Sequence, residues 1–168
     1  MTLIAEPQQS LTQESTSELA QRAVDLAWSL NARLAVAESC TAGVLAAALA
    51  LADGANACFL GGMIAYSPDA KYRLLGVPPG PVVSEEAVRQ MACGALQRFD
   101  ADVAVATTGV IGPIKEEGQP VGTLWLGGCM LGGPSLGIRK VLTGSDPVEQ
   151  RDAAVREALR LMIDMLHV

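Results

Sequence analysis

One short polar segment carries a side chain that could act as a nucleophile. Ser39 lies in the sequence Glu-Ser-Cys-Thr-Ala-Gly at 38–43, between a short apolar run and an alanine-rich stretch. This pattern predicts a serine between the end of a strand and the start of a helix. Free N–H groups at a helix start attract a phosphate or a developing oxyanion. The same residues also suit a simple helix N-cap, and the pattern alone does not separate the two interpretations.

The general base for such a serine is expected to be a residue other than histidine. The only histidine is His167, next to last in the chain, where a side chain is usually too mobile for catalysis. Tyr66 ends a predicted strand, and Lys71 lies one turn into the helix predicted after it. Both could project into a crevice at the strand ends, and a desolvated lysine can act as a base. The alternative is a solvated lysine beside a half-buried tyrosine.

A second strand end carries a glycine-containing loop, Thr-Thr-Gly-Val-Ile-Gly-Pro at 107–113. Backbone N–H groups in such a loop could bind a phosphate or shape a pocket, with Thr108, Gly109 and Gly112 as candidates. An ordinary turn is the alternative. The segment Gln-Pro-Val-Gly-Thr at 119–123 is a further candidate for a pocket wall.

The four cysteines, at 40, 58, 93 and 129, form no Cys-x-x-Cys pair. With one histidine in the chain, the spacing argues against a zinc site, and we expect small buried thiols in a reducing compartment. Cys40 is the exception to consider, since a thiol at a helix start can become acidic and reactive. Without a nearby histidine, Ser39 is the preferred nucleophile.

Composition narrows the class of protein. Half of the 168 residues are apolar, 18% are charged, and the net charge is −6. These values exclude disorder over most of the chain and argue against non-specific binding to nucleic acid or anionic membranes. No apolar run is long enough for a membrane span, and the first residues do not resemble a signal peptide. We expect a cytoplasmic protein with a flexible tail over 1–14 and one domain over 15–168.

Strands and helices alternate along the chain. Helices are predicted after the cap at Ser15, over 43–52, after Ser67-Pro68 as far as Gly76, after Ser84, and over 148–166. Strands are predicted over 34–37, 58–66, 102–107, 121–131 and 136–142. The alternation favours an α/β domain with helices on both faces of the sheet. The last two strands have no helix between them and should be antiparallel neighbours, which makes the sheet mixed.

Five blocks of sequence in this order resemble one family. They are AESCTAG, GGMIAYSPDAKYRLLGV, VVSEEAVRQMACGAL, ADVAVATTGVIGP and PVGTLW. The chain resembles the CinA C-terminal domain, the family of nicotinamide-nucleotide amidases (nicotinamide mononucleotide deamidases), over about residues 17–166. The nucleotide-hydrolase-like domain that often precedes this domain has no counterpart here, so we expect a stand-alone form.

The resemblance implies a three-layer α/β/α sandwich with a small mixed sheet. It also implies hydrolysis of the carboxamide of nicotinamide mononucleotide to nicotinic acid mononucleotide and ammonia, a step of pyridine-nucleotide salvage, without a metal or cofactor. The family's catalytic serine, lysine and tyrosine fall on Ser39, Lys71 and Tyr66. Substrate binding is expected from residues at the strand ends and from one arginine: Cys40, Thr41, Gly43, Thr108, Gly109, Gly112 and Arg151.

The chain departs from the family pattern around the expected substrate pocket. The altered positions are Ala42, Ile111, Ile114, Lys115, Glu116, Gln119 and Pro147. These changes leave a second possibility, a paralogue that binds a nucleotide or small amide without turnover. A third alternative is an enzyme that uses the thiol of Cys40. A homo-oligomer is also left open, since the apolar Leu124, Leu126, Met130 and Leu131 suit either a core or an interface.

Overall fold

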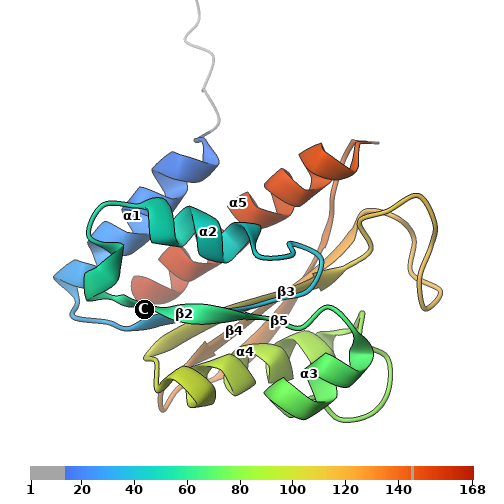
Figure 1. Cartoon of the computed structure of the whole chain (residues 1–168), viewed down its shortest axis with the longest axis horizontal. Helices are drawn as coiled ribbons and strands as arrows, with labels where there is room; N and C mark the ends of the chain where they lie inside the picture. Colours follow the sequence, from blue (N-terminus) through green and yellow to red (C-terminus); the bar gives the residue numbers. More distant parts are fainter. Residues whose placement is uncertain (1–13, 145) are drawn as a thin grey trace, which may run out of the picture.

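The computed structural model describes residues 14–144 and 146–168, which form a five-stranded mixed sheet in the order β2-β1-β3-β4-β5 (Figure 1). The central strand β1 runs parallel to β2 and β3, whereas β4 is antiparallel to both β3 and β5. The strands are β1 (Leu34–Glu38), β2 (Phe59–Ile64), β3 (Val103–Gly109), β4 (Thr123–Met130) and β5 (Ser135–Val141). The predicted antiparallel pairing of the last two strands is confirmed.

Helices cover both faces of this sheet, which confirms the predicted three-layer α/β/α architecture (Figure 1). One face carries α1 (Thr16–Ser29), α2 (Val44–Leu51) and α5 (Pro147–Leu166), and a short 3-10 turn, η1 (Ala55–Ala57), precedes β2. The other face carries α3 (Pro68–Leu75) and α4 (Glu85–Phe99). Each face therefore has its own apolar core.

Local capping signals explain where the helices begin. Ser15 and Glu18 form a reciprocal capping box at α1. Ser67 accepts a hydrogen bond from the backbone of Ala70, with Pro68 at the first helical position, and Ser84 caps α4 in the same way. These three predicted starts are confirmed. The predicted flexible tail falls on residues 1–13, outside the described residues, and on Glu14, which pairs with Arg22.

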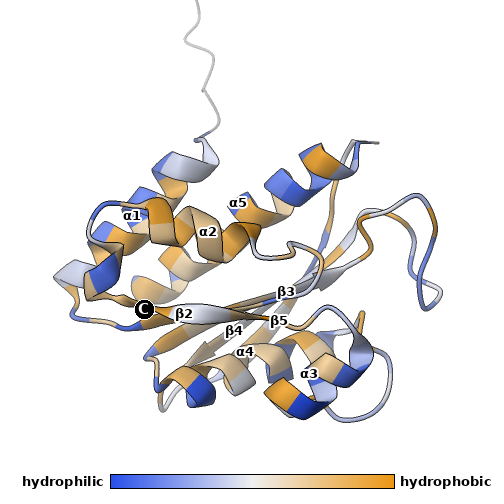
Figure 2. Cartoon of the chain, viewed as in Figure 1, coloured by the Kyte–Doolittle hydropathy of each residue, from blue (hydrophilic) through white to orange (hydrophobic). Residues whose placement is uncertain are grey.

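The apolar residues concentrate between the layers (Figure 2). Strand β1 is buried over its whole length, because its side chains alternate between the two cores. Leu124 and Leu126 belong to the core, whereas Leu131 is exposed. Within the described part of the chain, no helix has both the length and the apolar character needed to cross a bilayer.

Candidate active site

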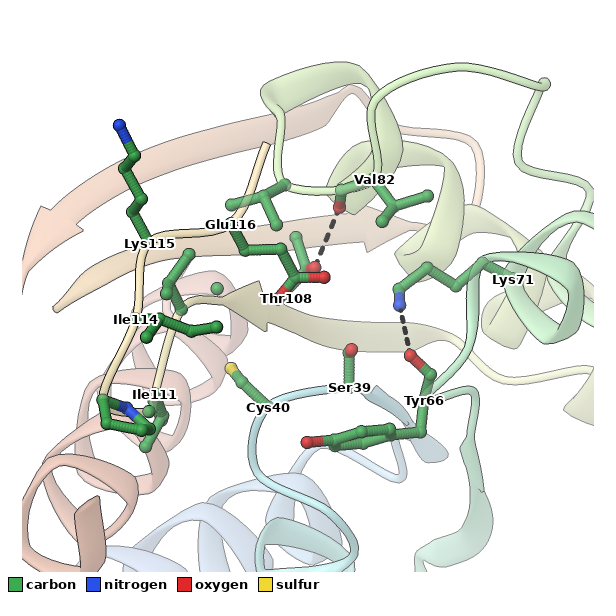
Figure 3. A pocket seen from close by; sticks show the side chains of 15 residues that line it. Ser39, Cys40, Tyr66, Lys71, Val82, Thr108, Ile111, Ile114, Lys115 and Glu116 are labelled. Atoms are coloured by element: carbon green, nitrogen blue, oxygen red, sulfur yellow. Dashed lines mark hydrogen bonds between the residues drawn. The ribbon is translucent and has the colours of Figure 1, made fainter. Parts of the chain in front are cut away.

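A cavity of about 300 Å³ opens where the neighbouring parallel strands β1 and β3 end. After β1 the chain turns to β2 on one side, and after β2 it crosses to β3 on the other, so this edge is a topological switch point, where ligands bind in open α/β sheets. The side chains around the cavity come from four segments (Figure 3). They are Ser39 and Cys40 after β1, Tyr66 and Lys71 around the start of α3, Val82 and Val83 before α4, and residues 108–116 after β3.

Lys71 is one of the largest fully buried side chains of the molecule, with 2% of its surface exposed. Its Nζ atom donates a hydrogen bond of 2.9 Å to the backbone carbonyl oxygen of Tyr66. Burial lowers the pKa of Lys71, and the negative charge of Glu116 opposes that shift in part. A lysine in this setting loses its proton more readily than one in water, as a general base must.

A close contact between two helices places Lys71. Gly94 on α4 faces the last turn of α3, and a Cβ atom at Gly94 would lie 2.3 Å from the carbonyl oxygen of Leu75. Only a residue without a side chain allows α3 to approach α4 this closely. The glycine therefore sets the position of the helix that carries the lysine.

Ser39 follows β1 directly and is held there by its backbone. Its N–H donates to the carbonyl oxygen of Thr107 at 3.0 Å, which ties the residue to the end of β3. The Ser39 side chain faces the cavity on the side from which Lys71 enters (Figure 3). Among the described residues, Ser39 Oγ has no hydrogen bond to Lys71 or to any other group. Hydrogen bonds between catalytic groups commonly tighten when substrate binds.

Tyr66 approaches the cavity differently from the expectation. Its side chain is 67% exposed, and its ring lies along the cavity below Ser39 (Figure 3). The contact between Tyr66 and Lys71 runs through the backbone carbonyl of the tyrosine and not through its hydroxyl. The structure thus brings Ser39, Tyr66 and Lys71 to one cavity, with the phenol at its open side.

Glu38 organises the turn around Ser39, a role that the sequence analysis missed. This buried carboxylate accepts hydrogen bonds from the backbone N–H groups of Gly43, Leu45 and Ala46 at 2.9, 3.1 and 2.8 Å. The N-terminus of α2 is therefore already occupied by a protein anion. The glutamate next to the serine was the sequence signal that could have indicated this role. The three hydrogen bonds depend, however, on a positive φ of 96° at Gly43, which the sequence does not show.

The backbone N–H groups around the start of α2, where an oxyanion site is expected, differ in whether they already have an acceptor. The helical N–H groups of Leu45 and Ala46 are taken by Glu38. The backbone N–H groups of Cys40 and Thr41, by contrast, have no acceptor within the described residues. The turn immediately after Ser39, and not the helix itself, therefore has donors left for an oxyanion.

The environment of Cys40 disfavours a thiol nucleophile. Its side chain is buried, and burial raises the pKa of the Cys40 thiol to about 12 although a hydrogen bond with Thr107 opposes the shift. At neutral pH the sulfur therefore remains a thiol, which is the unreactive form. Cys40 lines the cavity as a small apolar group beside the serine.

The predicted substrate-binding residues divide into two groups. Cys40, Thr108, Gly109 and Gly112 line the cavity. Thr41 is buried and pairs its hydroxyl with that of Thr107 at 2.7 Å, and Gly43 is the N-cap of α2.

Arg151, on α5, is also outside the lining of this cavity. Its Nε atom donates to the carbonyl oxygen of Cys40 at 3.3 Å and so supports the turn after Ser39 from behind. Contacts of all seven predicted residues with a substrate stay predictions.

The segment after β3 ends in a tight hairpin that the sequence analysis did not identify. Glu116 and Gln119 exchange two backbone hydrogen bonds of 3.2 and 2.8 Å around Glu117 and Gly118. The Glu117 carboxylate accepts the backbone N–H groups of Val82 and Val83 at 3.0 and 2.8 Å. These contacts fix the hairpin over the cavity. The Glu-Gly pair is a usable turn signal, but the distant anchor at 82–83 is not readable from sequence.

The architecture and the strand-end cavity define the class as an α/β/α domain with a serine- and lysine-lined pocket at its switch point. Residues 16–166 match the family model of the CinA C-terminal domain. The chain therefore belongs to the CinA C-terminal domain family.

Relatives and solved structures agree with this assignment. A CinA-like protein of Mycobacterium marinum is 47% identical over 116 residues, which are 66% of this chain and 27% of the relative. A CinA-like protein of Frankia casuarinae is 42% identical over 81% of this chain and 32% of the relative. The chain thus spans about a third or less of these curated relatives.

The solved structures match over nearly their whole length. A competence-damaged protein (CinA) superfamily protein of Klebsiella pneumoniae is 34% identical, with a TM-score of 0.87, over 92% of this chain and 99% of that one. A protein of the same superfamily from Enterobacter cloacae is 28% identical, with a TM-score of 0.90, over 98% of this chain and 99% of that one.

Proposed function

We propose that this chain is an amidase that hydrolyses the carboxamide of nicotinamide mononucleotide to nicotinic acid mononucleotide and ammonia. The observation that carries the proposal is the buried Lys71, whose pKa is lowered and which lines the same cavity as Ser39. A serine and an amine whose burial favours the neutral form together supply a nucleophile and its base without an imidazole. The choice of nicotinamide mononucleotide as the substrate rests on the family resemblance.

The chemical steps follow from the positions of these groups. Neutral Lys71 removes the proton of Ser39 Oγ, and the oxygen attacks the amide carbon. The N–H groups of Cys40 and Thr41 stabilise the oxyanion, and Lys71 returns the proton to the departing nitrogen, which leaves as ammonia. Lys71 then takes a proton from water as the water oxygen attacks the acyl carbon, and it returns that proton to Ser39 Oγ as the ester bond breaks, which restores the serine and releases the acid product.

A direct experiment measures ammonia and nicotinic acid mononucleotide after incubation of the purified protein with nicotinamide mononucleotide. Stoichiometric release of both products, absent from a matched Ser39→Ala preparation, is the expected result. A well-folded protein that binds the nucleotide but releases no ammonia would reject the amidase and favour a binding paralogue. The circular dichroism spectra of both preparations provide the folding control.

A further inference from the structure

A carboxylate without a protein partner enters the cavity from the hairpin. Glu116 lines the cavity, and its side chain points inward toward Thr108, on the side that Lys71 also faces (Figure 3). Its carboxylate makes no ion pair and no hydrogen bond with any of the residues that the structure describes. It is also the first of the charges that oppose the lowering of the pKa of Lys71, which agrees with its position across the same space.

The hairpin holds Glu116 in this position by two independent contacts. The paired backbone hydrogen bonds with Gln119 fix its main chain. The neighbouring Glu117 is anchored to the N–H groups before α4, so the turn cannot swing away without breaking both of those bonds. Figure 3 shows the adjacent Lys115 directed away from the cavity centre, as expected for successive residues of an extended segment. Both residues are exposed and line the cavity, with the Glu116 carboxylate directed into it and the Lys115 ammonium directed out of it.

We propose that Glu116 is a specificity-determining residue that binds the cationic ring of the substrate. This inference rests on the proposed function and extends it to the charge of the ring. In nicotinamide mononucleotide the ring nitrogen carries a positive charge, and the carboxamide is attached to that ring. A ring whose carboxamide reaches Ser39 must occupy the same 300 Å³ space that the Glu116 carboxylate lines, and this volume is at the low end for small-molecule sites.

The charges of Glu116 and Lys115 are opposite to those of the two charged groups of the nucleotide, the cationic ring and the anionic phosphate. Opposite charges attract, and the exposed Glu116 carboxylate lines the cavity, so it favours a cationic ring over an uncharged ring of the same shape by the modest amount typical of solvent-accessible ion pairs. An anionic group would be repelled from the same position. The negatively charged phosphate is therefore expected to point away from Glu116, toward the edge of the cavity where Lys115 lies.

The test compares two ligands that differ in ring charge and share the ribose, phosphate and carboxamide. They are nicotinamide mononucleotide and its 1,4-dihydro form, whose ring is uncharged. Dissociation constants of both are measured by calorimetry on the Ser39→Ala background, so that neither ligand is consumed. Glu116→Gln on this background is expected to reduce the preference for the cationic form by about twofold to fivefold. Lys115→Gln is the matched control and should leave the preference unchanged.

The possible outcomes distinguish a failure of the Glu116 proposal from a failure of the amidase proposal. Measurable binding of both forms with the same preference in the Glu116→Gln protein would overturn the role of Glu116 and leave the amidase proposal intact. An equal change of preference in the Lys115→Gln protein would also overturn the role of Glu116. The preference would then depend on any charge near the cavity and not on Glu116 itself. Binding of neither form to the Ser39→Ala protein would contradict the nucleotide as ligand and the inference with it.

Discussion

The Nζ atom of Lys71 lies 2.9 Å from the backbone carbonyl oxygen of Tyr66, so a peptide group and not a carboxylate holds the buried amine. A carbonyl oxygen accepts a hydrogen bond from either protonation state of the lysine, whereas a carboxylate would strongly stabilise the charged one. The contact therefore orients the amine toward Ser39 without preventing it from acting as a base. This relationship is compatible with the base role proposed for Lys71 in a cavity whose lining contains no histidine.

The rate should depend on pH through Lys71. Burial lowers the pKa of Lys71, so the fraction of neutral amine grows as the pH rises through a value below that of a lysine in water. We expect kcat/KM to increase with pH along a single titration and to level off once the amine is neutral. The measurement is a profile of kcat/KM between pH 6 and about pH 10. A flat profile would remove Lys71 as the base.

Lys71→Met should separate catalysis from stability. Because the folded-state pKa of Lys71 is lowered, the unfolded chain binds more protons between the two pKa values, and stability rises with pH across that window. At neutral pH the buried amine therefore opposes folding, and methionine of similar length removes that penalty. We expect loss of turnover with no decrease in the free energy of unfolding in urea at pH 7. A strongly destabilised variant would show that the amine is structurally required.

Glu38→Ala should destabilise the protein and disorder the turn around Ser39. The substitution leaves three backbone N–H groups at the start of α2 without an acceptor. We expect a loss of at least about 2 kcal/mol in the free energy of unfolding, measured in urea. Glu86→Ala is the matched control, since this exposed glutamate also lies in the first turn of a helix, and it should change stability by less than about 0.5 kcal/mol.

Gly94→Ala reverses the usual effect of alanine in a helix. Alanine normally stabilises a helix interior relative to glycine, but here the added Cβ would meet the Leu75 carbonyl oxygen at 2.3 Å. We expect α3 to shift, with a loss of about 1–3 kcal/mol and a reduced kcat because Lys71 moves with the helix. At Gly112 a Cβ has no heavy atom within 4 Å, so Gly112→Ala should be nearly neutral for stability. A stabilised Gly94→Ala protein would contradict the proposed close contact.

Most of the fold could be predicted from local signals in the sequence. The serine caps at 15, 67 and 84 and the alternating apolar patterns depend on nearest neighbours, and they located the helices and strands. The position of the site at the ends of strands was also predicted, whereas the strand order that makes this edge a switch point comes from the structure. Residues that act through distant contacts were missed. Glu117 binds a segment 34 residues away, and Gly94 matters only because α3 approaches it.

The comparison of Ser39 and Cys40 tests the central claim most directly. Ammonia release from nicotinamide mononucleotide should be measured for the wild-type protein, Ser39→Ala and Cys40→Ala at matched concentration. We expect Ser39→Ala to lose at least about 10³-fold in rate and Cys40→Ala to keep most of the activity, because the thiol stays protonated. Retained turnover in Ser39→Ala, or its abolition in a well-folded Cys40→Ala protein, would contradict a serine nucleophile.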